Sequence, residues 1–264
     1  MKKIKNYENL ADNISEFLRK YAVANGLKTL VVGVSGGIDS AVVSTLCART
    51  GLPTILVTMG INKLPDSNAI SHIKWLESKY PNVVHKDVDL TSTFDTLVES
   101  ITGDGFLSSF DTELAEVNTR SRCRMVTLYF ISNSTNGMVV GTGNRVEDFG
   151  IGFFTKFGDG GVDISPIGDL MKSEVRELGR YLGVSESIIG AAPTDGLWDD
   201  PTKTDEAQIG ATYGELEWAM DTTIAEEFMT QREKVVMAIY QKRHTQNQHK
   251  MQMPPIFDTI NNRK

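Results

Sequence analysis

Apolar residues in the first half of the chain follow two alternating patterns. Short continuous apolar runs, typical of strands buried on both faces, occupy residues 30–34, 54–59, 83–88 and 138–141. Apolar residues at helical spacing occupy residues 7–24, 40–49, 67–79, 91–101 and 112–132. Strands that alternate with helices predict an α/β fold, in which a parallel sheet with right-handed crossovers is flanked by helices.

The second half of the chain has a different character. Residues 141–163 contain seven glycines, which predicts a loop after the fourth strand rather than a packed element. The residues that follow predict a helical C-terminal portion. No Pro- or Ser-rich linker, repeat or low-complexity tract interrupts the 264 residues, so we expect a single domain over residues 1–264.

The first apolar run leads into the most informative segment, which reads LVVGVSGGIDS over residues 30–40. A strand, a glycine turn and a helix in this order direct backbone N–H groups and the positive end of a helix dipole at one point, where a phosphate binds. Ser35 and Ser40 add hydroxyl donors, and Ser40 is a candidate helix cap. The candidate ATP-binding residues of this loop are Gly33, Val34, Ser35, Gly36, Gly37, Ile38, Asp39 and Ser40.

The loop lacks the lysine of a Walker motif and the Gly-x-Gly-x-x-Gly of dinucleotide-binding folds. Instead, Asp39 stands where phosphates would lie, and the repulsion between them implies a bridging Mg²⁺. The loop resembles that of the ATP pyrophosphatases, which cleave ATP between the α- and β-phosphates. The alternative interpretation is an ordinary strand-to-helix turn.

The glycine-rich segment carries polar side chains with matching chemistry. Thr142 is a candidate donor to a ribose or phosphate, and Glu147 is a candidate second carboxylate for Mg²⁺ beside Asp39. Lys156 can pair with an anion, and Asp163 can bind a polar substrate group. Because loops after parallel strands meet at the carboxyl edge of the sheet, we expect this segment and the phosphate loop to form one site.

Composition narrows the classes of partner. A formal charge of −7 disfavours bulk binding of nucleic acid, and no apolar run reaches the length of a membrane span. The basic N-terminus lacks the apolar core of a signal peptide. Cys47 and Cys123 form no Cys-x-x-Cys pair, which fits a reducing cytoplasm. We expect Cys47 to be a core residue and Cys123, between two arginines, to be structural rather than a thiolate.

Taken with the phosphate loop, the segment GTGNRVEDFGIGFFTKFGDGGVD closely resembles the NAD synthetase family. Further matching segments are NTRSRCRM at 118–125, DISPI with LMK over 163–172, PTDGLW at 193–198, TDE at 204–206 and HK at 249–250. The resemblance implies a Rossmann-like adenine nucleotide alpha-hydrolase fold. It also implies a cytoplasmic, homodimeric ligase of NAD biosynthesis, in which ammonia amidates nicotinic acid adenine dinucleotide (deamido-NAD) through an acyl adenylate, with AMP and pyrophosphate released. The length leaves no room for a glutaminase domain, so free ammonia is the expected nitrogen source.

The resemblance also implies roles for single residues. Besides residues 33–40, the ATP-binding residues are Thr142, Lys172 and Thr194, and the Mg²⁺ ligands are Asp39 and Glu147. Deamido-NAD would contact Arg122, Lys156, Asp163, His249 and Lys250. Asp39, Lys172 and Asp163 are the candidate catalytic residues. ATP is the co-substrate and Mg²⁺ the cofactor.

Two segments depart from the family pattern. The family follows its second strand with Arg-Leu-Pro-x-Gly-x-Gln, whereas this chain has Thr58-Met59-Gly60-Ile61-Asn62, so ATP contacts from that loop are not expected to be the same. The interval from Glu147 to Lys156 is one residue longer, which predicts a different path for the loop.

Other interpretations stay open. A tRNA-thiolating or GMP-amidating ATP pyrophosphatase would share the phosphate loop, and a non-catalytic nucleotide-binding protein would keep the fold. Isolated cysteines argue against thiolation, and two metal carboxylates argue against a passive binder. Arg120, Arg122 and Arg124 alternate along a helix and cannot all face one site. His249 lies in a polar stretch that is equally compatible with a frayed helix end.

Overall fold

The computed structural model describes residues 4–194, 196–198 and 203–257. Its sheet is parallel, with strand order β3-β2-β1-β4, and it confirms the α/β fold expected from the sequence. The strands are β1 (Thr29–Gly33), β2 (Thr54–Gly60), β3 (Val83–Asp89) and β4 (Gly137–Val139). A single parallel bridge between Val140 and Ile164 extends the edge beyond β4.

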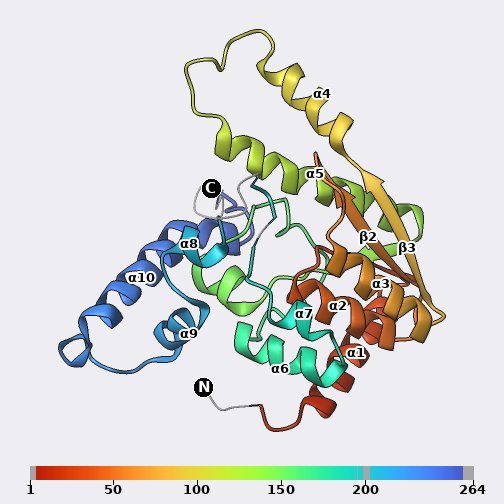
Figure 1. Cartoon of the computed structure of the whole chain (residues 1–264), viewed down its shortest axis with the longest axis horizontal. Coiled ribbons are helices and arrows are strands. Elements are labelled where there is room, and N and C mark those ends of the chain that lie inside the picture. The colour runs from red at the N-terminus through yellow and green to blue at the C-terminus, as the bar shows by residue number, and fades with distance from the viewer. Residues whose placement is uncertain (1–3, 195, 199–202, 258–264) are drawn as a thin grey trace, which may run out of the picture.

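Helices follow the strands at the expected places. The first five are α1 (Tyr7–Ala24), α2 (Ile38–Arg49), α3 (Ser67–Lys79), α4 (Thr91–Thr102) and α5 (Glu113–Ser134). The C-terminal half contains α6 (Lys172–Leu182), α7 (Glu186–Ile189), α8 (Asp205–Ile209), α9 (Tyr213–Asp221), the 3₁₀-helix η2 (Glu226–Phe228) and α10 (Gln231–Met251). The helical C-terminal portion expected from the sequence is therefore present (Figure 1).

The main core lies on one face of the sheet. Fully buried side chains of β1 and β2, such as Leu30 and Leu56, pack against α2 through Val42 and Leu46. Apolar residues of α1, α3, α6 and α7 complete this core. Cys47 is part of it and has no solvent exposure, as expected for a structural cysteine. The core fixes α2, and therefore the loop that precedes α2, against the strand ends.

A second core corrects the expectation for the glycine-rich segment. Val146–Ile151 forms a π-helix, η1, rather than loop, and Val146 and Ile151 are fully buried. They pack with Tyr213 and Leu216 of α9, with Ile209 of α8 and with Val236 of α10. The prediction of an unpacked loop was wrong here because these apolar partners in α8, α9 and α10 lie 58 or more positions later in the sequence.

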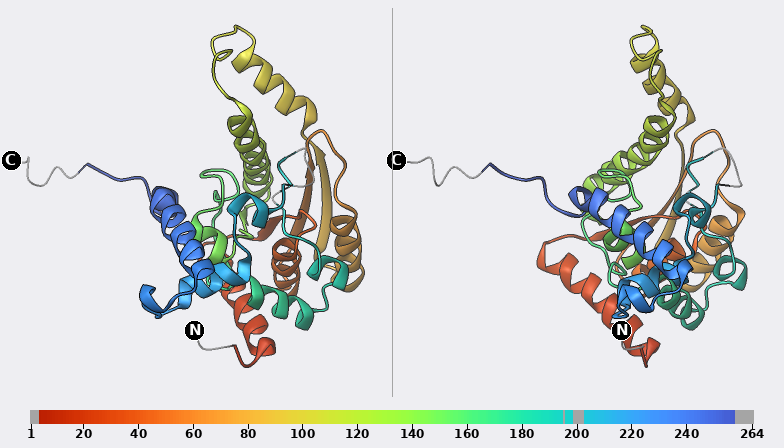
Figure 2. Two further views of the ribbon diagram at one scale, coloured as in Figure 1. Left: turned by 60° about the vertical axis from the view of Figure 1, so that its left-hand side comes forward. Right: turned by 90° about the vertical axis from the view of Figure 1, so that its left-hand side faces the viewer.

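Helices α4 and α5 form a projection from the body of the molecule (Figures 1 and 2). A small cluster of Ile61, Leu90 and Phe94 fixes the base of α4. Large apolar side chains are exposed on α4, on α5 and on the segment between them, at Leu97, Ile101, Phe106, Phe110, Leu114, Val126 and Phe130. Among the described residues, no helix combines the length and apolar character needed to cross a membrane.

Candidate active site

The phosphate loop connects β1 to α2 at the carboxyl edge of the sheet. Gly37 is the N-cap residue of α2, and the backbone N–H groups of the residues after it form the first turn of the helix. Ser40 lies inside the first turn, where its hydroxyl donates to the Gly37 carbonyl oxygen at 3.0 Å and accepts from the Ser35 N–H at 3.2 Å. Ser40 therefore ties the loop together, and the prediction that it caps the helix was wrong.

Gly36 shows why this loop needs glycine. Its φ of +95° lies in the region that favours glycine, and a Cβ there would stand 2.8 Å from a carboxylate oxygen of Asp66. Asp66 in turn caps α3 by accepting from the Asn68 N–H at 2.7 Å. The loop is thus held between the starts of α2 and α3, and its Ser35 and Gly37 N–H groups donate to the hydroxyls of Ser40 and Ser35.

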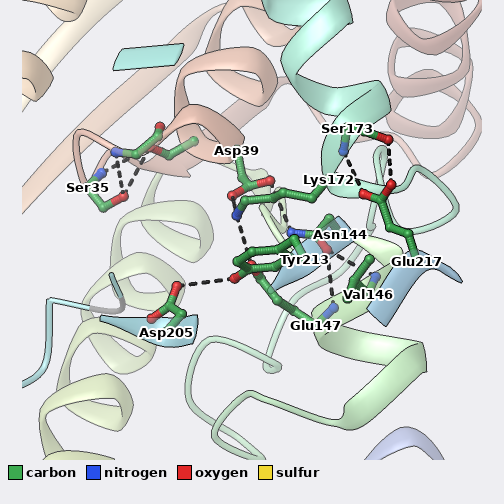
Figure 3. Close-up of polar contacts among 12 residues, drawn as sticks. Ser35, Asp39, Asn144, Val146, Glu147, Lys172, Ser173, Asp205, Tyr213 and Glu217 are labelled. Atoms are coloured by element: carbon green, nitrogen blue, oxygen red, sulfur yellow. Dashed lines mark hydrogen bonds and ion pairs between the residues drawn. The ribbon is translucent and has the colours of Figure 1, made fainter. Parts of the chain in front are cut away.

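Three charged side chains from distant parts of the sequence meet beside this loop (Figure 3). The Lys172 ammonium donates to Asp39 Oδ2 at 2.5 Å and to Glu147 Oε1 at 2.8 Å. Asp39 comes from the first turn of α2, Glu147 from η1, and Lys172 is the first residue of α6. Lys172 is 3% exposed, so its charge is neutralised by these carboxylates rather than by water. The three residues expected from the sequence to act together are brought together.

Two further residues of this cluster were missed by sequence reasoning. Tyr213 donates its hydroxyl to Glu147 Oε1 at 2.5 Å, and that hydroxyl also contacts Asp205 Oδ2 at 3.2 Å. Asn144 donates to Asp39 Oδ1 at 3.2 Å, while its own Oδ1 accepts from the Val146 and Glu147 N–H groups. Asn144 thereby links the phosphate loop to the first turn of η1.

A local signal existed for only one of the two. Asn144 precedes an acidic segment in the way that a helix-capping residue does. Tyr213 follows Thr212 at the start of a short helix and carries no motif of its own. Asp205, part of the TDE segment that matches the family, is also buried and faces the Tyr213 hydroxyl.

Burial makes the charges of the cluster interdependent. It raises the pKa of the Asp39 carboxyl; Lys172 opposes that shift, and the Glu147 charge adds to it. Burial also acts to raise the pKa of the Glu147 carboxyl. The charge of Lys172 and the hydrogen bonds from Lys172 and Tyr213 outweigh it, so that this pKa is lowered. Burial and the Glu147 charge raise the pKa of the Tyr213 hydroxyl, which therefore stays a donor.

The donor set suits a divalent cation. Two carboxylates from separate elements already surround a positive charge, that of Lys172. Mg²⁺ takes oxygen ligands, typically one or two carboxylates together with waters and substrate phosphates, and the phosphate loop lies beside these carboxylates. No group of three or more His, Cys, Asp or Glu side chains occurs in the described parts of the chain, so the residues alone do not form a complete metal cage.

The residues expected to contact deamido-NAD lie outside this cluster. Arg122 donates to the Lys156 carbonyl oxygen at 3.4 Å, and the Lys156 ammonium donates to the His249 carbonyl oxygen at 2.6 Å. Lys250 donates to the carbonyl oxygens of Gly152 and Phe154 at 2.6 and 2.8 Å. These cations gather around the segment that follows η1, where they bind main-chain oxygens. His249 is exposed and lies in the last turn of α10.

Asp163 lies beside β4, and the structure does not bring it into the Asp39–Lys172–Glu147 cluster. Its carboxylate accepts from the Tyr129 hydroxyl at 3.0 Å and from the Val139 N–H at 2.7 Å. Thr142 is half-buried just after the sheet edge. Thr194 is exposed, and its hydroxyl accepts from the Gly196 N–H at 3.2 Å.

The three arginines of α5 point to three different partners. Arg120 stacks over Phe94 at 4.9 Å and donates to the Leu197 carbonyl oxygen, whereas Arg124 donates to the Met59 carbonyl oxygen. With Arg122 near Lys156, this agrees with the expectation that they do not share one site. Burial raises the pKa of the Cys123 thiol, so it is not a thiolate.

A cavity of about 580 Å³ adjoins the segment after η1. Its walls come from α5, α8, α10, residues 152–159 and residues 197–198. They include Asn118, Asp159, Trp198, Arg243 and Lys250. Asp159, also missed from the sequence, accepts from the Ser121 hydroxyl at 2.7 Å and from the Thr155 N–H at 3.0 Å.

Comparison with known proteins gives a consistent result. A family model described as NAD synthase matches residues 10–254. The NH(3)-dependent NAD(+) synthetase of Archaeoglobus fulgidus is 35% identical over 256 residues, which is 95% of this chain and 97% of that protein. That of Alkaliphilus metalliredigens is 35% identical over 93% of this chain and 96% of its own length.

Solved structures agree on the fold. The NMN synthetase of Francisella tularensis has a TM-score of 0.83 and 29% identity, and covers 97% of this chain and 100% of its own. An NH3-dependent NAD synthetase from Campylobacter jejuni has a TM-score of 0.75 and 24% identity, with coverage of 96% and 100%. The chain is thus similar to these proteins over nearly its whole length.

Proposed function

The chain belongs to the NAD synthase family, and from that premise we propose that it amidates deamido-NAD with ammonia, at the expense of ATP, to give NAD, AMP and pyrophosphate. The observation that carries this proposal is the Asp39–Lys172–Glu147 cluster beside the phosphate loop. The cluster and the loop combine a buried cation, two carboxylates suited to a metal and backbone N–H donors, which are the groups that adenylation requires.

A carboxylate resists attack by ammonia because oxide is a poor leaving group. In the proposed reaction, a nicotinate carboxylate oxygen forms a bond to the α-phosphorus of ATP, and the bond from that phosphorus to the bridging oxygen breaks. Pyrophosphate takes the electron pair of that bond. The nitrogen of ammonia then attacks the acyl carbon, AMP leaves with the bonding electrons, and one proton is released.

The residues of the site are suited to the charge that develops on pyrophosphate. Backbone N–H groups at the start of α2 face the loop, and Lys172 supplies a buried cation that does not need to shed a shell of water. Loss of one such donor typically costs about 3–4 kcal/mol of transition-state stabilisation. Mg²⁺, when bound, would neutralise phosphate charge, and Asp39 and Glu147 would hold it.

The decisive experiment supplies purified protein with ATP, Mg²⁺, ammonium and deamido-NAD and measures NAD and AMP. We expect the two products in equal amounts. Formation of ADP in place of AMP, or no NAD, would refute the proposal. Omission of ammonium should leave adenylation without amide formation, which separates this protein from a passive nucleotide binder.

A second candidate substrate is nicotinic acid mononucleotide. It is favoured by the similarity to the NMN synthetase structure, whose TM-score of 0.83 exceeds the 0.75 of the Campylobacter NAD synthetase. The chemistry would be the same, since both substrates carry the nicotinate carboxylate. Measuring kcat/KM for the two substrates in parallel decides between them: the preferred substrate is the one with the higher value.

We also propose that the protein is a homodimer that joins through α4 and α5. The segment between these helices exposes Phe106 by 76% and Phe110 by 64%, and α5 exposes Phe130 by 74%, which is unusual for side chains that face water permanently. A second copy of the same surface would cover them. Sedimentation should give a dimer for the wild type and a monomer for Phe130→Glu, and a monomeric wild type would refute this proposal.

The remaining expectations also belong here. We propose a cytoplasmic setting, because Cys47 and Cys123 are free and neither is in a position suited to a metal or redox pair. The single-domain organisation over residues 1–264 and the contacts of Thr142, Thr194 and Asp163 with substrates are proposed on the family resemblance.

A further inference from the structure

The C-terminal helix α10 contacts the catalytic segment through a row of side chains. His244, Asn247 and Lys250 recur every three residues, so they lie along one side of α10. All three side chains reach the segment that ends η1 and follows it. Neither the family resemblance nor the sequence pattern gave a role to His244 or Asn247.

The contacts are hydrogen bonds to consecutive main-chain oxygens. His244 Nδ1 lies 2.7 Å from the Gly150 carbonyl oxygen, and Asn247 Nδ2 donates to the Ile151 oxygen at 2.8 Å. Lys250 Nζ donates to the Gly152 oxygen at 2.6 Å. Since a carbonyl oxygen only accepts, Nδ1 of His244 carries the proton. The row therefore binds three carbonyl groups in sequence.

These carbonyl groups need partners because they end a helix. The last carbonyl groups of a helix find no N–H donor within it. The main-chain N–H groups of Gly152 and Phe153 both donate to the main-chain carbonyl oxygen of Glu147. The carbonyl groups at the end of η1 are therefore left to donors from elsewhere. The side chains of α10 supply those donors from outside the segment.

Gly152 provides independent evidence that the contact is built into the fold. Its φ is +63°, and a Cβ at this position would stand 2.3 Å from the Cβ of Asn247. Only glycine lets Asn247 come close enough to donate to Ile151. The two segments of the chain, η1 and α10, approach each other at the residue where the π-helix ends.

We propose that His244, Asn247 and Lys250 are positioning residues that cap η1 and so set the place of Glu147 in the site. Glu147 lies at the other end of the same six-residue helix, between Lys172 and Tyr213. A shift of the capped end displaces the Glu147 carboxylate because the short, buried helix moves as one body. This inference rests on the proposed function, which assigns Glu147 to the metal and phosphates.

The principal test compares Asn247→Ala with Gln248→Ala, a matched change at the neighbouring exposed position of α10. Partners that orient a metal ligand typically contribute about 10–100-fold to metal affinity or activity. We expect Asn247→Ala to weaken binding of Mg²⁺·ATP about tenfold in isothermal titration calorimetry and to raise the Mg²⁺ concentration for half-maximal rate. Gln248→Ala should change neither quantity.

A second pair of variants separates positioning from general stability. His244→Leu removes the donor, whereas His244→Asn retains an N–H near the position of Nδ1. We expect His244→Leu to weaken Mg²⁺·ATP binding and His244→Asn to restore it. A purely structural role would lower the unfolding temperature and leave the affinity of the folded protein unchanged. If Asn247→Ala does not fold, the His244 pair decides.

Unchanged Mg²⁺·ATP affinity in both Asn247→Ala and His244→Leu would overturn the inference. The proposed function fails in a different way. A wild-type protein that binds Mg²⁺·ATP but amidates neither nicotinate nucleotide would refute the reaction and leave the calorimetric comparison valid.

Discussion

The two carboxylates of the site come from regions that are built in opposite ways. Asp39 lies in a segment whose strand, turn and helix are adjacent in sequence. The main core under α2 draws on β1, β2, α1 and α3 of the same half of the chain and is completed by α6 and α7. Glu147 lies in a π-helix that is buried by α8, α9 and α10 and capped by α10. The strand, turn and helix of the first region are therefore predictable from adjacent residues, whereas the π-helix of the second region is buried by residues far away in the sequence.

This contrast explains how much of the site the sequence revealed. The strands and helices of residues 7–134 match their predicted bounds closely, because each has its own period and its own end signals. The glycine-rich segment carries no such period. Its helical part was taken for a loop, since the apolar partners of Val146 and Ile151 follow much later in the chain.

The same reasoning applies to single side chains. Asp39 could be proposed as a metal ligand because it lies in the phosphate loop, and Glu147 because it lies in a glycine-rich segment expected at the same sheet edge. Tyr213 could not, because a tyrosine at the start of a short helix is compatible with any core. Its partner Glu147 is 66 residues away, and only the folded chain brings the two together.

The largest effect should come from the charge of the locally encoded carboxylate. Asp39→Asn keeps the shape of the side chain but removes a charge from beside Lys172, so we expect a loss of kcat on the order of 10²–10³-fold. The measurement is the rate of AMP and NAD formation. Asp95→Asn, an exposed change on α4, is the control, and near-normal turnover of Asp39→Asn would remove the metal role.

A second effect concerns only the phosphate-loop side. His72 of α3 is 4% exposed and contacts Ser44 and the Ala41 oxygen of α2, and burial lowers its pKa from 6.5 to about 4. Because the unfolded chain binds this proton more tightly than the folded protein does, the folded protein is most stable above the unfolded-state pKa of the histidine. This contribution is lost as pH falls from about 6.5 to about 4, and amounts to roughly 3 kcal/mol.

Urea unfolding at several pH values measures this dependence. His72→Gln should flatten the fall in unfolding free energy between pH 6.5 and pH 4 that the wild type shows. If both proteins lose stability equally over that range, His72 does not control the acid response of this region.

A third prediction probes the distantly encoded side through backbone and packing. Gly152 and Gly26 have similar φ values of +63° and +68°, but a Cβ at Gly26 meets nothing within 4 Å. Gly26→Ala should therefore cost only the strain of a left-handed backbone, about 1 kcal/mol. Gly152→Ala adds the clash with Asn247 and should cost about 1–3 kcal/mol more.

Chemical denaturation of the two alanine variants tests this difference. Equal destabilisation would show that α10 gives way at no cost, and the contrast between the two regions would then be weaker than the structure indicates.

The smallest effect is expected at the tyrosine that joins the regions. Tyr213→Phe removes the hydroxyl that contacts both Glu147 and Asp205, and we expect about a tenfold lower kcat. Loss of this buried hydrogen bond to the Glu147 carboxylate should also cost about 1–3 kcal/mol of stability. Steady-state kinetics and thermal unfolding measure the two, and an unchanged kcat would show that the Tyr213 hydroxyl does not orient Glu147.

The ion pair between Lys172 and Asp39 spans 133 positions of the chain. It therefore closes a very long loop, and such closures come late when a protein folds because their entropy cost is met only after nearby contacts exist. During synthesis, the phosphate loop leaves the ribosome long before its cation. The catalytic centre is therefore completed only when α6, which carries Lys172, has docked against α2.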